Sequence, residues 1–155
     1  MLDYVRSHWG GDHMRFWILV SAILAGSLAH GEESFDQVFN RLAKVDQFAI
    51  GGVGFAGVIS QGEKDYRLLL SRPSALSDFE RLLLEGNPQA KCYALFGIRT
   101  LSPGRFKDIV KSLRNVEDKV VIERGCIVSH ETLGAVLKDI ERDRYREVKA
   151  SKFGS

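Results

Sequence analysis

The stretch SALSDFERLLLEGNPQAKCYALFGIRTL, Ser74–Leu101, decides the fold. Its first half repeats apolar residues at helical spacing, namely Leu76, Phe79, Leu82 and Leu83. Gly86 is typical of the residue that follows a helix. Asn87 and Pro88 then mark a new start, with asparagine as N-cap and proline at the first helical position. We therefore expect two helices joined by a tight turn, the second of which runs to about Thr100.

Similar start signals predict further helices on both sides of this stretch. Serines stand at four expected helix starts, namely Ser34, Ser60, Ser102 and Ser129. Ser60 and Glu63 fit a capping box, and the helix that they open is expected to stop before Pro73. The first helix carries an amphipathic stripe of Phe35, Val38, Phe39, Leu42 and Val45. The chain is therefore expected to be mainly α, a small helical domain of antiparallel helical hairpins.

Residues 116–128 do not follow a helical pattern. Val120–Ile122 and Ile127–Val128 are β-branched and surround Arg124, Gly125 and Cys126. Such residues are typical of short strands. An extended loop that is held by a disulfide explains them equally well. Both interpretations stay open.

Residues 74–115 resemble a HEAT-type helical hairpin with one further helix. SALSDFERLLLEG is similar to the first helix of such a unit, GNP to its turn, and PQAKCYALFGIRTL to its second helix. In the second helix Ala90, Ala94 and Gly97 form a stripe of small residues that lets two helices approach closely. Only one unit is present, whereas a solenoid needs about three. The resemblance implies protein binding on a helical surface.

An apolar run near the start, Phe16–Ala29 (FWILVSAILAGSLA), is typical of a secretory signal. It is shorter than the about 20 apolar residues that a membrane-spanning helix needs. Met14 followed by Arg15 makes a better signal start than the residues before it, so translation is expected to begin there. Ala29 and Gly31 offer the small residues that a signal peptidase needs for cleavage before Glu32, and Ser27 with Ala29 is a second option. The alternative is a signal anchor that is never cleaved.

The leader sets the expected domain organisation and location. Residues 1–31 are expected to be an N-terminal extension with the signal peptide, 32–150 a single helical domain and 151–155 a disordered tail. The mature protein is therefore expected to be secreted or periplasmic, with no stable membrane insertion after cleavage. Two cysteines in an exported chain predict a disulfide between Cys92 and Cys126. Two free, buried thiols are the alternative.

The glycine-rich passage is expected to be an ordered, buried loop, with Phe55, Val58 and Ile59 packing inward. It contains Gly51, Gly52, Gly54 and Gly57, too many glycines for a regular helix. Gly52–Gly57 also matches G-x-G-x-x-G, which binds dinucleotides only where a strand precedes it and a helix begins inside it. An amphipathic helix precedes it here, so no cofactor is expected.

Charge and residue types argue against several kinds of function. The formal net charge of +2 gives no electrostatic footprint for nucleic acid. Both tryptophans and three of the four histidines lie at or before residue 31, which leaves His130. A catalytic zinc site usually takes three protein ligands, so neither a metal site nor a set of catalytic residues is expected. A Cys126–His130 nucleophile pair and a pair of carboxylates for glycoside cleavage are the two catalytic alternatives.

The expected function is therefore that of an exported, non-enzymatic protein-binding module whose protein partner is unknown. An inhibitor or immunity-type protein that blocks a secreted enzyme or toxin is a second hypothesis, and a small hydrolase is a third. The expected contact surfaces are the loop of Gly51, Gly52, Gly54, Phe55 and Gly57, and the helix positions Gln89, Lys91 and Arg99. The sequence leaves the oligomeric state open.

Overall fold

The computed structural model describes residues 34–145, and this part of the chain is mainly helical, as predicted. It contains six helices and two two-stranded antiparallel sheets. The predicted leader and the predicted tail at 151–155 lie outside the described residues. Among the residues that are described, no helix is long and apolar enough to cross a membrane.

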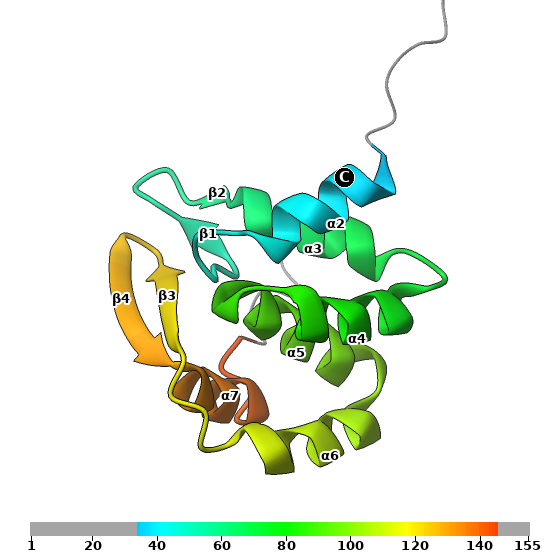
Figure 1. Ribbon diagram of the computed structural model, residues 1–155. Helices are drawn as coiled ribbons and strands as arrows, with labels where there is room; N and C mark the ends of the chain where they lie inside the picture. Colours follow the sequence, from blue (N-terminus) through cyan, green and yellow to red (C-terminus); the bar gives the residue numbers. More distant parts are fainter. Residues whose placement is uncertain (1–33, 146–155) are drawn as a thin grey trace, which may run out of the picture. The chain divides into compact units, whose positions relative to one another are not determined.

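The centre of the fold is the helical hairpin that the sequence predicts. Helix α4 (Ala75–Glu85) and helix α5 (Pro88–Leu101) pack against each other along their length (Figure 1). The Asn87 side chain caps α5 by accepting a hydrogen bond from the Ala90 N–H at 2.8 Å. A Cβ atom on Gly97 would lie 2.5 Å from the Phe79 ring. Gly97 therefore permits the close approach of the two helices that the small-residue stripe predicts.

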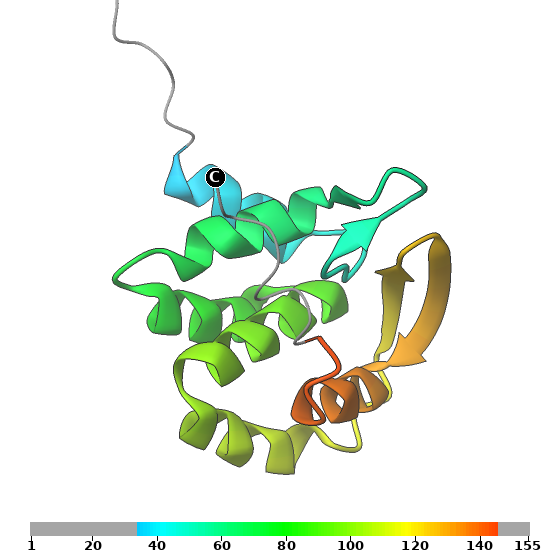
Figure 2. The ribbon, with the colours of Figure 1, turned by 180° about the vertical axis from the view of Figure 1, so that it is seen from behind.

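The other helices surround α5. Helices α2 (Phe35–Ala43) and α3 (Gln61–Leu70) pack together next to α4, whereas α6 (Pro103–Leu113) and α7 (Leu133–Glu141) cover α5 from the other side (Figure 2). Eight residues of α5 are buried. Because it contacts α3, α4, α6, α7 and a strand, α5 is the central helix of the domain.

The segment that the sequence leaves open forms a β-hairpin. Strands β3 (Lys119–Arg124) and β4 (Ile127–Thr132) pair with each other, and Gly125 and Cys126 form the turn. Gly125 has a φ of 58°, which glycine adopts readily. The expected helix start at Ser129 is wrong, because Ser129 lies in β4. Helix α7 is instead capped by Thr132, whose hydroxyl accepts a hydrogen bond from the Ala135 N–H at 3.2 Å.

A second, shorter hairpin lies beside the first. Strands β1 (Gly52–Val53) and β2 (Val58–Ile59) are formed by the glycine-rich passage. Phe48, which precedes them, pairs with β3: its N–H donates to the Val121 carbonyl at 2.8 Å, and its carbonyl accepts from the Glu123 N–H at 3.1 Å. The chain entering the short hairpin is thus fixed to the inner edge of β3.

Candidate partner-binding surface

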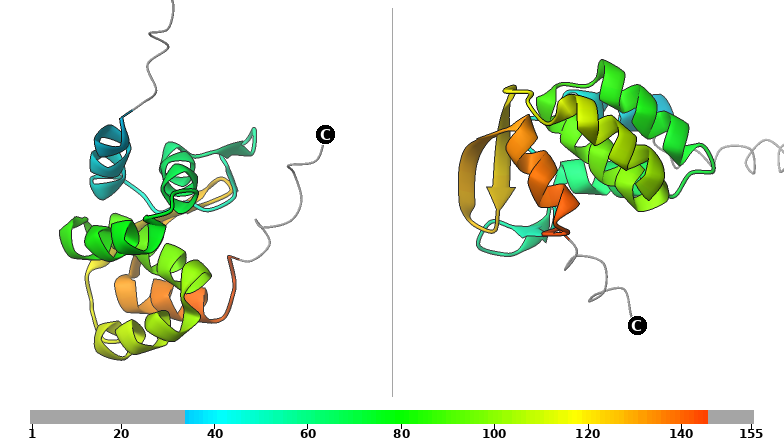
Figure 3. Two further views of the ribbon diagram at one scale, coloured as in Figure 1. Left: turned by 90° about the vertical axis from the view of Figure 1, so that its right-hand side faces the viewer. Right: turned by 90° about the horizontal axis from the view of Figure 1, so that it is seen from below.

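The tips of the two hairpins meet. The Gly54 N–H, at the end of β1, donates to the Gly125 carbonyl in the β3–β4 turn at 2.8 Å. An isolated bridge between Val53 and Gly125 accompanies this bond. The two hairpins accordingly lie side by side in Figure 1 and in both views of Figure 3. Two segments that are about 70 residues apart in sequence thus contribute to one surface.

The expectation that Phe55 and Val58 pack inward is wrong. Val53 and Val58 are paired across the hairpin, so residues 54–57 form a turn beyond the last strand pair. Gly54 and Gly57 both have positive φ values, 67° and 61°, and the Gly57 N–H donates to the Gly54 carbonyl at 3.2 Å. The turn projects from the domain, so Phe55 has nothing to pack against. Only Val53 is buried in this hairpin, and Ile59 is half-buried.

Four apolar side chains form what we call the tip surface. Their exposed fractions are 104% for Phe55, 59% for Val58, 70% for Ile127 and 56% for Val128. Half of the large apolar side chains that are exposed in residues 34–145 are therefore on these two hairpins. Scattered apolar residues are normal on a protein surface, but several on adjoining elements are typical of an interaction site.

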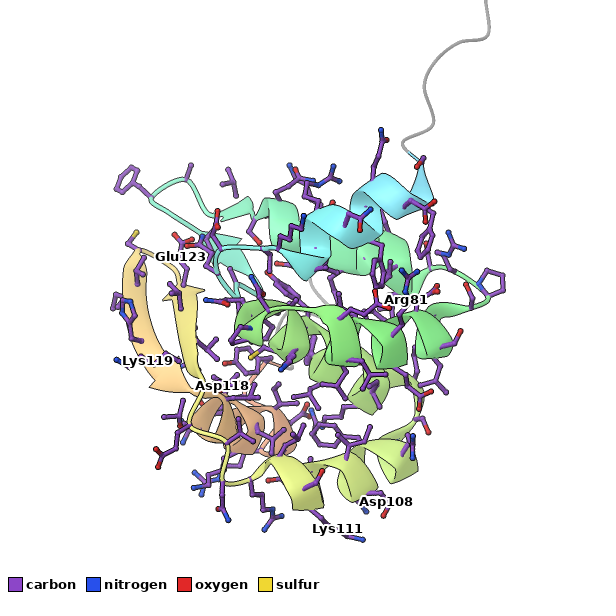
Figure 4. The ribbon with its side chains drawn as sticks, viewed as in Figure 1. Arg81, Asp108, Lys111, Asp118, Lys119 and Glu123 are labelled. Carbon is purple, nitrogen blue, oxygen red and sulfur yellow. The ribbon has the colours of Figure 1, made fainter. Side chains whose placement is uncertain are left out.

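The tip surface carries no charge, and the charged groups behind it, Glu123 and Arg124, are hydrogen-bonded within the domain. Residues 51–60 and 125–129 contain no Asp, Glu, Lys or Arg. Glu123, which Figure 4 labels near the end of β3, accepts a hydrogen bond from the Gln47 amide. The Arg124 guanidinium donates to Asp139 at 2.9 Å and to the Tyr145 hydroxyl at 2.7 Å. Contact here would depend on apolar burial rather than on charge attraction.

Buried polar groups hold the short hairpin at its base. Glu63, which is only 1% exposed, accepts a hydrogen bond from the Gly51 N–H at 2.7 Å and one from Arg67 at 2.5 Å. The Tyr93 hydroxyl accepts from the Ala49 N–H at 3.0 Å and donates to the Ala49 carbonyl at 2.9 Å. Burial raises the pKa of Tyr93 to about 12, so this hydroxyl stays protonated as a donor. The projecting turn is therefore mounted on a rigid base.

The second expected surface, on α5, is less accessible. Gln89, Lys91 and Arg99 are half-buried, because α5 is the central helix. The Arg99 guanidinium pairs with Asp143 at 2.7 Å, and the Lys91 ammonium lies 4.0 Å from the Asp118 carboxylate. These side chains stabilise contacts between elements, so they offer a partner little free surface.

A separate apolar groove of about 560 Å³ lies between α4 and α6. Its apolar lining consists of Leu83, Leu84, Ile109, Leu113, Val116 and Leu133. The charged groups around it include the ion pair of Arg105 with Glu80 at 2.8 Å and that of Lys91 with Asp118. Leu84 is 83% exposed. It therefore provides an exposed apolar residue away from the hairpins with which the tip surface can be compared.

The predicted disulfide is not formed in the structure. Both cysteines are free: Cys92 is buried in α5, where its thiol lies 3.4 Å from the Pro88 carbonyl, whereas Cys126 is exposed in the β3–β4 turn. The alternative of two buried thiols therefore applies to Cys92 alone. Burial also raises the pKa of the Cys92 thiol, which keeps it protonated and unreactive.

We expect the native protein to react with a thiol reagent at Cys126 only. Cys92 should react only after unfolding, because it is inaccessible and protonated in α5. Absorbance of the released thiolate of Ellman's reagent measures the number of thiols, and the Cys126→Ser variant is the control. A native protein with no reactive thiol and a mass two hydrogens short would mean that the disulfide forms after all.

The glycine motif and the Cys126–His130 pair both lie in β-hairpins. Gly52–Gly57 lies in the β1–β2 hairpin, and α3 begins only at Gln61, so no helix starts inside the glycine motif. Cys126 and His130 lie on a turn and a strand rather than on one helix. In residues 34–145 no group of three or more His, Cys, Asp or Glu side chains is placed to hold a metal ion.

Comparisons with protein-family models, with curated proteins and with solved structures found no match. The features of this chain that bear on its function are therefore those of its own surface. Phe55 was a candidate from the sequence, but Val58, Ile127 and Val128 were not expected to be part of a site. One sequence signal could have identified the β3–β4 hairpin. It is the β-branched residues, without proline, on either side of Gly125 and Cys126.

Proposed function

We propose that this protein is an exported, non-enzymatic module that binds another protein through the tip surface. The observation that carries the proposal is the exposure of Phe55 and Ile127 on adjoining hairpin tips. An aromatic side chain on a rigid base is the kind of residue that contributes most of the binding energy at protein interfaces. Burying it in a partner removes apolar area that the folded domain leaves in water.

Two further observations support the proposal. The leader that the sequence predicts would deliver the domain to the periplasm or the medium after cleavage near Gly31, and the tip surface would meet its partner there. The α4–α5 hairpin resembles a HEAT-type unit, which implies protein binding, although the exposed apolar residues are concentrated on the hairpins. We therefore assign the contact to the tip surface rather than to the helical faces.

The test is capture of partner protein by tagged full-length chain from envelope extracts and medium, after mild chemical cross-linking. The variant Phe55→Ser/Ile127→Ser removes the two most exposed side chains of the tip surface. It is expected to reduce recovery of the partner about tenfold or more. Both side chains are exposed, so its thermal midpoint should stay within a few degrees of that of the unchanged protein.

The matched control is Leu84→Ser, which removes from α4 an apolar side chain whose exposed fraction, 83%, lies between those of Phe55 and Ile127. It should leave the recovery of the partner unchanged. Loss of the partner with Leu84→Ser but not with the tip variant would assign binding to the α4–α6 groove and would overturn the proposal.

A further inference from the structure

The outer edge of β4 is open. Val121 and Glu123 bond to Phe48 on the inner side of β3, and in the register they are opposite His130 and Val128. Backbone groups alternate between the two sides of a strand in an antiparallel ladder. The N–H and C=O groups of Val128 and His130 therefore point away from β3. No strand in the described part of the chain pairs with that edge.

This edge lacks the usual protection against pairing. Natural edge strands often carry lysine, proline or a bulge. The sequence of β4 is IVSHET, with neither lysine nor proline, and its register with β3 is continuous over all six residues. Figure 1 and the right-hand view of Figure 3 both place β4 outermost among the described elements on this side. An added strand would meet no neighbouring element among residues 34–145.

We infer that the open edge of β4 binds the same edge of a second copy of this chain, in antiparallel orientation about a twofold axis. This inference rests on the proposed function, since it names a partner for the surface that includes Ile127 and Val128. The register places Val128 opposite His130 of the second copy, with Ser129 on the axis. The result is a continuous four-stranded sheet, β3–β4 followed by β4–β3 of the second copy.

Self-pairing suits this edge for two reasons. Val128 and His130 each offer one outward N–H and one outward C=O, so the reciprocal pairing uses all of these groups in four backbone hydrogen bonds. Glu131 is the only acidic or basic residue in β4 apart from the histidine, and the register places it opposite Ile127 of the second copy. Like charges therefore do not meet, and exposed Val128 gains His130 of the second copy as a cross-strand neighbour.

Sedimentation velocity of the full chain, from about 1 to about 200 µM with reductant present, tests the inference. We expect a species of twice the chain mass of 17.4 kDa. His130→Pro removes an outward N–H while leaving the β3–β4 bonds in place. Val128→Lys adds the charge that protects natural edges. Each variant should raise the dimer dissociation constant about tenfold or more.

Two controls separate the edge from other contacts. Cys126→Ser should leave the dimer intact, because the pairing is not covalent, and so should Leu84→Lys, which adds charge to α4. A monomer at every concentration, or a dimer that both edge variants leave unchanged, would overturn the inference. If that monomer still captures another protein through Phe55 and Ile127, the proposed function survives; if capture fails as well, both are overturned.

Discussion

Replacing Gly97 with alanine is expected to lower the free energy of unfolding by about 2–3 kcal/mol, the upper part of the range for overpacking a filled core. The added Cβ would lie 2.5 Å from two atoms of the Phe79 ring, well inside van der Waals contact. Phe79 is fully buried, so its ring has no free space to move into. In chemical denaturation the midpoint should fall with little change in the slope, and the thermal midpoint should fall by roughly 10 °C or more.

The matched control for this substitution is Gly104→Ala in α6. A Cβ there would meet no atom within 4 Å, and alanine is the better helix former. This variant should be as stable as the unchanged protein or more stable by about 0.5 kcal/mol. In addition, Phe79→Leu should reduce the effect of Gly97→Ala, since the two side chains share one space. Equal stability of Gly97→Ala and Gly104→Ala would mean that α4 and α5 do not approach as closely as the structure has them.

Replacing Glu63 with alanine is expected to destabilise the protein by about 2 kcal/mol, because a buried carboxylate with several partners is lost. The Gly51 N–H loses this acceptor, and the ion pair between Glu63 and Arg67 is lost. The effect stays below that of a fully buried pair because Arg67 is 31% exposed and can bind water instead. Amide hydrogen exchange should also become faster in residues 51–57, which Glu63 ties to α3.

Glu85→Ala is the matched control, since Glu85 also pairs with an arginine four residues away, Arg81. Both side chains of that pair are about half exposed, and Arg81 is labelled on α4 in Figure 4. Loss of the Glu85 carboxylate should leave both the thermal midpoint and amide hydrogen exchange in the short hairpin unchanged. If Glu63→Ala behaves in the same way, Glu63 is not what holds the base of the hairpin.

Local signals in the sequence were sufficient for most helix boundaries. Asn87 and Pro88 placed the start of α5, and Ser60 placed the start of α3, because a cap is an interaction within a few residues. The sequence signal places the last helix start at Ser129 and not at Thr132, because both residues can cap a helix. The strand that contains Ser129 forms only through its register with β3, which is set by a partner segment.

The candidate surface could be predicted only in part for the same reason. Gly54 and Phe55 were identified as a possible contact from the unusual density of glycine. Phe55 points outward because Val53 and Val58 pair across the hairpin and leave residues 54–57 as a turn. Ile127 lies close to the same tip because Gly54 is hydrogen-bonded to Gly125. The disulfide was predicted from cysteine count and expected export, neither of which says that α5 is the central helix. The burial of Cys92 within the packing of α5 decides whether the disulfide forms.

In the proposed function, the apolar side chains of the joined hairpin tips bind another protein. Its most direct test is the amount of partner recovered on Phe55→Ser/Ile127→Ser relative to the amount recovered on Leu84→Ser. Tip-surface binding predicts that this ratio falls to about one tenth while both variants keep their thermal midpoints. A ratio near one would contradict the claim, because it would mean that the exposed tips contribute nothing to binding.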